Sequence, residues 1–351
     1  MNLYRLLVRF FRIVNQLYFT EVHTVGRGRV PAGRPLIIAA NHPSSILDSI
    51  LLGTQVPRKI HYLAGSKLFR WPVLARLFRH LGAIPVYRRD ETPDHGERNV
   101  EVFETVYRLL EQGGCVGIFP EGRNSPDGHV RELRTGTARI ALGAEARNEY
   151  RLESRIVPVG ITFEDREFLT SAVLISFGEP IRPADYAALH RTDPERAVRK
   201  LTEALQDALR REALHIEDRQ LGPLVNDLSA ILAHDLATGR GLSAGELEPR
   251  SPPVSLIKRP LLTVLGWYHR GSETKGRVIE ARAHNRRHVS AVLNRAIHHY
   301  PDAVEDLRNR VDRYKDHVDQ ARLRRTLRDS IGEPVRGRLL RLRMTLYAIA
   351  V

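Results

Sequence analysis

The sequence is nearly free of cysteine, with Cys115 alone among 351 residues. One cysteine excludes an intramolecular disulfide and favours a reducing compartment. Because Cys115 lies in the apolar run 114–119, we expect a small buried side chain rather than a nucleophile. No apolar run reaches the roughly 18 residues that a membrane-spanning helix needs. The N-terminal stretch also lacks the unbroken apolar core and the cleavage site of a signal peptide.

Acidic residues are fewer than basic ones, 41 against 55, which gives a net charge of +14 and a pI near 10.3. Such an excess indicates an anionic partner, either nucleic acid or a phosphate-rich membrane face, unless it reflects a solvated basic surface. The sequence has no helix-turn-helix, zinc-ligand or RNA-binding aromatic signature, so we expect no nucleic-acid partner. His284 and His288 stand four apart, as metal ligands on a helix can, but arginines surround them and we expect no metal.

Residues 1–25 are predicted to form an N-terminal amphipathic helix at a membrane interface. Arg5, Arg9 and Arg12 oppose a continuous apolar face. This pattern is typical of a helix lying in a bilayer interface, although a helix packed on its own core has the same period. The apolar face comprises Leu3, Leu6, Leu7, Phe10, Phe11, Val14, Leu17 and Tyr18.

Residues 26–215 alternate between strand and helix patterns, which predicts an α/β layer architecture. The expected strands are 36–40, 62–64, 116–119, 156–162 and 173–177, and the expected helices include 71–81, 97–112 and 135–146. Residues 216–351 are predicted to be a basic helical region with a linker or turn at 239–260. Its arginine-flanked apolar end, 344–351, would span only about 12 Å as a helix and therefore cannot cross a bilayer.

A histidine and an aspartate follow the expected strand 36–40. The segment 41–48 reads Asn-His-Pro-Ser-Ser-Ile-Leu-Asp and contains His42 and Asp48. Histidine is the usual general base of enzymes, and a carboxylate that accepts its second ring N–H fixes the tautomer. Ser44 and Ser45 are interpreted as turn or capping residues in preference to acyl carriers.

Three further segments follow in order. They are Gly-Ala-Ile-Pro-Val-Tyr-Arg-Arg at 82–89, Ile-Phe-Pro-Glu-Gly-Arg at 118–123 and Ile-Val-Pro-Val-Gly-Ile at 156–161. Together with segment 41–48, they resemble the sequence blocks of the phospholipid/glycerol acyltransferase family, whose members acylate glycerol-3-phosphate and lysophosphatidic acid. The resemblance covers residues 1–180, about half of the chain.

The resemblance implies a central mixed sheet flanked by helices, with the N-terminal amphipathic helix before it and an α-helical extension after it. It implies that His42 is the general base and that Asp48 orients it. The remaining residues that it assigns to substrate binding are Arg88, Arg89, Glu121, Gly122 and Arg123, with Lys67 added as a further cation for the same phosphate.

Two departures from the family pattern affect these assignments. Five residues separate His42 from Asp48, whereas the commonest family pattern has four, so a turn or bulge is needed for the side chains to meet. The third block reads Glu-Gly-Arg-Asn-Ser where many members read Glu-Gly-Thr-Arg-Ser, which leaves open which residue takes the arginine role.

The resemblance implies acyl transfer from acyl-CoA or acyl-carrier protein to 1-acyl-sn-glycerol-3-phosphate, with no cofactor. Glycerol-3-phosphate and other lysolipids are the alternative acceptors. A thioesterase using His42 and water is a second alternative, disfavoured by the basic residues of the second and third blocks. Membrane lipids are the expected partners, and the cytoplasmic face of a membrane is the expected location, with peripheral attachment.

Overall fold

The structure is a computed structural model that describes residues 3–19, 21–87, 95–125, 129–163, 172–218, 220–229, 283–284, 286–309 and 311–312. The chain divides into two compact units, Met1–Asn294 and Arg295–Val351. The predicted linker at 239–260 and the basic C-terminal end lie outside the described residues. The predicted boundaries near residues 25 and 215 stay predictions.

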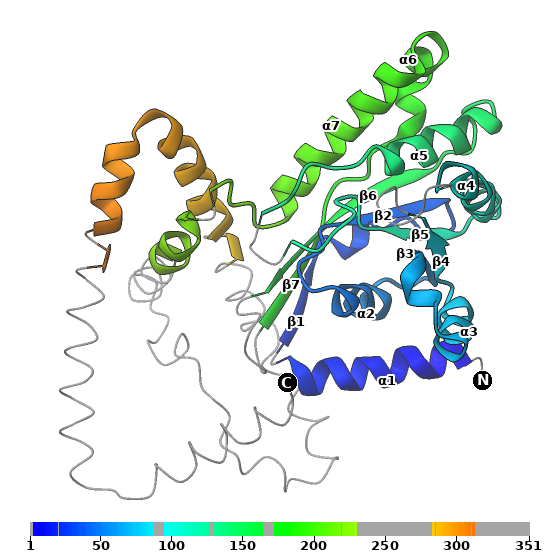
Figure 1. The fold of residues 1–351 in the computed structure, drawn as a ribbon, viewed down its shortest axis with the longest axis horizontal. Helices are drawn as coiled ribbons and strands as arrows, with labels where there is room; N and C mark the ends of the chain where they lie inside the picture. The colour runs from blue at the N-terminus through cyan, green and yellow to red at the C-terminus, as the bar shows by residue number, and fades with distance from the viewer. Residues whose placement is uncertain are drawn as a thin grey trace, which may run out of the picture. The chain divides into compact units, whose positions relative to one another are not determined.

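A twisted sheet organises the first unit, and its strands run in the order β1-β7-β6-β2-β5-β3-β4 (Figure 1). Paired strands are parallel except β6 and β7, which are antiparallel. The sheet is therefore mixed, as predicted. The strands are β1 Glu21–Val25, β2 Leu36–Ala40, β3 Ile60–Gly65, β4 Ile84–Val86, β5 Cys115–Ile118, β6 Arg155–Phe163 and β7 Ala172–Phe177.

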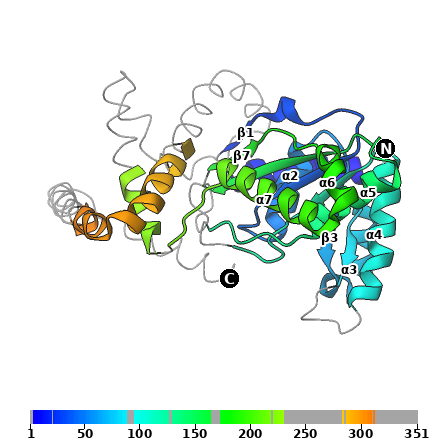
Figure 2. The ribbon, with the colours of Figure 1, turned by 90° about the horizontal axis from the view of Figure 1, so that it is seen from above.

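Helices cover both faces of this sheet, which confirms the predicted α/β layers. Figure 1 shows α5, α6 and α7 above the sheet and α1 and α2 below it, and Figure 2 views the sheet from the α7 side. The helices are α1 Leu3–Tyr18, α2 Ile46–Gln55, α3 Pro72–Leu81, α4 His95–Glu111, α5 Gly136–Arg147, α6 Ala187–Thr192 and α7 Pro194–Glu212. Short 3₁₀ turns are η1 Arg27–Arg29, η2 Ser66–Phe69 and η3 Pro183–Tyr186.

Strand β2 is apolar along its whole length because both of its faces are buried. Side chains alternate across a strand, so Ile37 and Ala39 join the core under α4, α5 and α7, while Leu36 and Ile38 join the core under α2. Cys115 belongs to this second core, and burial raises the pKa of its thiol to about 12. The prediction of a small buried cysteine is confirmed.

Helix α1 divides its wide apolar face between the protein and solvent. Asn15 donates through its side chain to Thr54 Oγ1 of α2 at 3.0 Å, which fixes one side of α1 against the domain. Leu6, Phe10 and Ile13 lie on the adjacent side and remain exposed. Core packing, one of the two interpretations of the pattern, therefore accounts for part of the face and leaves an exposed apolar stripe.

Candidate active site

The predicted His42–Asp48 contact is present at the carboxyl end of β2. His42 Nδ1 and Asp48 Oδ2 are 2.9 Å apart, and the Asp48 side chain is fully buried. The backbone N–H of Ser44 donates to the same carboxylate oxygen at 2.8 Å. This arrangement turns Nδ1 toward the carboxylate, so Nε2 is the ring nitrogen left to exchange a proton with a substrate.

A strained turn at Ser45 accommodates the extra residue between His42 and Asp48. Ser45 has φ +58° and ψ −124°, the angles of the first central residue of a type II′ turn, and Leu47 N–H donates to Ser44 C=O at 3.3 Å. A non-glycine residue rarely adopts this conformation. Helix α2 begins at the next residue, Ile46, and its first turn presents Asp48 to the imidazole. The predicted turn is confirmed.

The loop after β5 holds His42 from three directions. Phe119 stacks on the imidazole, with ring centroids 3.9 Å apart and an interplanar angle of 11°. The backbone N–H of His42 donates to Glu121 Oε1 at 2.9 Å, and its carbonyl accepts from Ser125 N–H at 2.9 Å. Segment 118–123, the third sequence block, therefore positions His42 of segment 41–48, the first block.

Glu121 is a buried carboxylate that joins two backbone segments. Its Oε2 accepts from Arg131 N–H at 3.0 Å, while Oε1 accepts from His42 N–H. Burial raises the pKa of Glu121, and the two N–H donors partly oppose that rise. Each oxygen has a backbone donor, so Glu121 ties the backbone of His42 to that of Arg131. Its predicted hydrogen bond to a glycerol hydroxyl stays a prediction.

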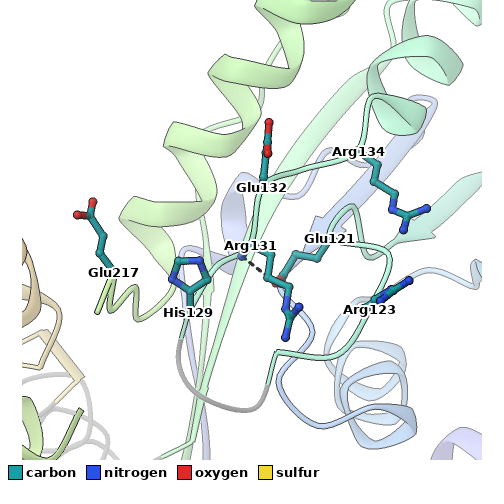
Figure 3. A pocket seen from close by; sticks show the side chains of 7 residues that line it. All are labelled: Glu121, Arg123, His129, Arg131, Glu132, Arg134 and Glu217. Atoms are coloured by element: carbon teal, nitrogen blue, oxygen red, sulfur yellow. Dashed lines mark hydrogen bonds between the residues drawn. The ribbon is translucent and has the colours of Figure 1, made fainter. Parts of the chain in front are cut away.

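A cavity of about 410 Å³ lies beside this loop (Figure 3). The residues lining it are Glu121, Arg123, His129, Arg131, Glu132, Arg134 and Glu217. Gly122 has φ +70°, and a β-carbon there would lie 2.8 Å from Arg134 Nε. Glycine therefore lets the Arg134 side chain lie close against the loop.

The structure places one predicted binding arginine at the cavity and a predicted lysine away from it, and the binding roles of both stay predictions. Arg123 lines the cavity, whereas Lys67 is an exposed residue of η2 that does not. Arg88 and Arg89 lie outside the described residues. Arg131 and Arg134 were not predicted, although two arginines shortly after the third block and just before a helix were a visible signal.

A second histidine holds the far end of this loop. His215 Nδ1 accepts from Val130 N–H at 3.2 Å, and the His129 and His215 rings are 5.0 Å apart. Burial, reinforced by Arg210, lowers the pKa of His215 to about 4. The ring is therefore neutral near pH 7, which is the form that can accept this hydrogen bond.

Within the described ranges, no helix is long and apolar enough to cross a membrane. The same residues include no group of three or more His, Cys, Asp or Glu side chains placed to hold a metal ion.

Comparisons with known proteins find acyltransferases as relatives of this chain. The sequence model of the family described as Acyltransferase matches residues 21–162. The 1-acyl-sn-glycerol-3-phosphate acyltransferase of Bacillus subtilis is 30% identical over 194 residues, which are 54% of this chain and 86% of that protein. Glycerol-3-phosphate O-acyltransferase 2 of Saccharomyces cerevisiae is 32% identical over 112 residues, 32% of this chain and only 15% of the yeast protein.

Among solved structures, the 1-acyl-sn-glycerophosphate acyltransferase of Thermotoga maritima has a TM-score of 0.43 with 22% sequence identity. The match covers 58% of this chain and 77% of that one.

Proposed function

Because this chain belongs to the acyltransferase family that includes the 1-acyl-sn-glycerol-3-phosphate acyltransferases, we propose that it moves a fatty acyl group from a thioester to the hydroxyl of a glycerol phosphate. The observation that carries the proposal is the 2.9 Å contact between His42 and the buried Asp48. The acceptor proposed first is 1-acyl-sn-glycerol-3-phosphate, with glycerol-3-phosphate or another lysolipid as the alternative. The donor is acyl-CoA or acyl-carrier protein.

In the proposed reaction, His42 Nε2 removes the proton of the acceptor hydroxyl as its oxygen attacks the thioester carbonyl. Asp48 stabilises the imidazolium that forms. When the tetrahedral intermediate collapses, the carbon–sulfur bond breaks and the imidazolium returns the proton to the leaving thiolate. The substrate oxygen is the nucleophile, so no acyl-enzyme is needed and the buried Cys115 takes no part.

The phosphate of the acceptor is proposed to bind at the arginines around the cavity. Arg123, Arg131 and Arg134 surround Glu121 in Figure 3. Planar guanidinium groups suit phosphate because they donate several hydrogen bonds in a fixed fork. Neither His42 nor Asp48 lines the cavity, so the phosphate would sit beside the base and the hydroxyl would extend toward it.

Arg123→Ala and Arg134→Ala are each expected to raise the KM for the acceptor about tenfold to a hundredfold. A charged hydrogen bond to phosphate contributes roughly 1.5–3 kcal/mol, and these variants remove one. The measurement is the initial rate against acceptor concentration at saturating donor. Arg139→Ala is the matched control, since Arg139 is an exposed arginine of α5 that does not line the cavity. An unchanged KM in both variants places the phosphate elsewhere, and Arg88 would be examined next.

The proposed function is tested with purified protein, one labelled acyl-CoA and a panel of acceptors. We expect consumption of the thioester only when a glycerol phosphate acceptor is present, with a new acyl ester detected by lipid mass spectrometry. Thioester loss that is equally fast without an acceptor contradicts acyl transfer and supports the thioesterase alternative, in which His42 activates water.

Peripheral attachment at the cytoplasmic face of a membrane is also proposed. The acyl chain of the acceptor partitions into the bilayer, so the site must work at its surface. The exposed stripe Leu6, Phe10 and Ile13 on α1 supports this, with Arg5 and Arg9 exposed beside it. A helix of this kind lies in the interface rather than spanning it.

A further inference from the structure

Exposed apolar side chains gather in two places in the first unit. The described part of the chain has eleven exposed large apolar side chains, and seven of them lie on α1 or in residues 68–77. The three on α1 are the stripe described above. The other four, on η2 and α3 and at the junction between them, are Leu68 at 49%, Trp71 at 72%, Val73 at 83% and Leu77 at 39% exposure. Large apolar groups this exposed mark interaction sites when they are contiguous.

The local fold keeps these four side chains outward. Val73 and Leu77 lie four residues apart on one face of α3, while Ala75 on the other face is buried. Trp71 immediately precedes the helix, and its carbonyl accepts from Ala75 N–H at 2.8 Å. The outward direction of the patch is thus set by the helix itself and by its buried opposite face.

The charge around the patch is of one sign. Residues 66–81 contain no aspartate or glutamate. They contain four basic residues, all exposed, which are Lys67, Arg70, Arg76 and Arg79. A partner for this segment must therefore offer negative charge together with an apolar interior. An anionic bilayer offers both at once, and tryptophan and arginine are typical of protein segments that lie at its surface.

The topology places this patch beside the site. Strands β2, β5 and β3 are neighbours and run parallel. Their carboxyl ends therefore share one edge of the sheet, where β2 leads to His42, β5 leads to Glu121 and β3 leads directly into η2. Two strand spacings separate the ends of β2 and β3, about 10 Å.

The patch also connects to α1. Lys59 Nζ lies 5.5 Å from the centre of the Tyr4 ring of α1 and donates to the carbonyl of His80 in α3 at 3.4 Å. Figure 1 shows α3 near the N-terminal end of α1, at the lower edge of the first unit. The two contacts of Lys59 therefore link α3 to the N-terminal end of α1.

We propose that Leu68, Trp71, Val73 and Leu77, with Lys67, Arg70, Arg76 and Arg79, form a second membrane-docking surface whose partner is an anionic bilayer. We refer to it as the η2–α3 surface. A single interfacial helix leaves a protein free to roll about the helix axis. A second contact away from that axis fixes the roll and keeps the His42 edge at the lipid surface. This inference rests on the proposed function in one respect, which is that a lipid acceptor requires the protein to work at a membrane.

The first test is vesicle binding without any chemistry. Trp71→Gln/Val73→Gln is expected to weaken binding to phosphatidylcholine–phosphatidylglycerol vesicles about tenfold or more, measured by flotation. Arg70→Gln/Arg76→Gln is expected to weaken it about fivefold for each arginine, and only on anionic vesicles. Val100→Gln is the matched control, since Val100 is a 62% exposed valine of α4. Leu6→Glu/Phe10→Glu serves as the comparison for α1.

Binding by the Trp71/Val73 variant equal to wild type overturns the proposal, provided that thermal unfolding shows an intact fold. The proposal is also overturned if light scattering shows that the variant has a different oligomeric state while its vesicle binding is unchanged. The surface would then contact a second copy of the chain. Activity on a short-chain, water-soluble acceptor is measured separately. A lack of activity on this acceptor would contradict the proposed function, whereas the vesicle-binding result would still decide the docking proposal.

A second test uses the tryptophan content. The chain has two tryptophans, Trp71 and Trp267, so Trp267→Phe leaves Trp71 as the only one. Its emission is expected to shift to shorter wavelength on addition of anionic vesicles and to be quenched by brominated lipid. An unchanged spectrum while the protein floats with the vesicles shows that Trp71 stays in water, which contradicts the η2–α3 surface.

Discussion

Replacing His42 with alanine is expected to lower the rate of acyl transfer by a factor on the order of 10²–10⁴ or more, because the general base is lost. The fold should survive, since the side chain lies at a strand end and the core beneath it is unchanged. Asp48→Asn is expected to be similarly severe. An amide in that buried position donates to Nδ1, which moves the ring proton to Nε2 and blocks the base.

The measurement is the initial rate with saturating donor and acceptor, together with the thermal unfolding curve of each variant. His23→Ala is the matched control. His23 lies on β1, which β7 and β6 separate from β2, so its loss should leave the rate unchanged. Near-normal turnover in a folded His42→Ala protein rules out the proposed base.

The second large effect is expected at Ser45, whose backbone makes the His42–Asp48 contact possible. Proline fixes φ near −65°, whereas Ser45 has φ +58°, so Ser45→Pro must rebuild the turn. We expect a rate loss of about a hundredfold or more, comparable to removing Asp48, while the substrate-binding cavity keeps all of its residues. The measurement is again the initial rate, with a crystal structure or chemical shifts to report the position of α2.

Ser45→Gly is the companion variant. Glycine adopts positive φ without strain, so activity is expected to stay near wild type and the free energy of unfolding to rise by about 1 kcal/mol. Ser44→Ala keeps the N–H that donates to Asp48 and should also remain active. Retained activity in both variants excludes either serine as an acyl carrier. Inactivity of Ser45→Gly would show that the hydroxyl, and not the turn, is what the reaction needs.

Local patterns predicted much of the sheet and the catalytic pair. The strand at 36–40 was apolar along its length because it is buried on both faces, and the spacing of His42 and Asp48 showed that a turn must lie between them. These features depend on residues close in sequence. The strand at 21–25 was not predicted, because it is half-buried and its partner β7 lies far along the chain.

The positioning contacts could not be predicted for the same physical reason. Glu121 meets the backbone of His42 across 79 residues of sequence, and no local period reports such a pair. The third block suggested a substrate ligand at Glu121, which stays a prediction, but it gave no sign that both carboxylate oxygens also accept from backbone N–H groups. The approach of Arg134 to Gly122 is likewise a contact between two parts of one loop, set by the loop's three-dimensional path.

The pairing of β1 with β7 sets the order of events during synthesis. Glu21 is opposite Ala172, so the ribosome must add about 150 residues after β1 before its partner exists. At about 5–20 residues per second, this takes roughly 8–30 s. During that interval α1 and its apolar stripe leave the ribosome before the sheet edge formed by β1 and β7 exists. Under the proposed membrane attachment, a nascent chain has time to contact lipid through α1 first and to complete its sheet at the bilayer surface.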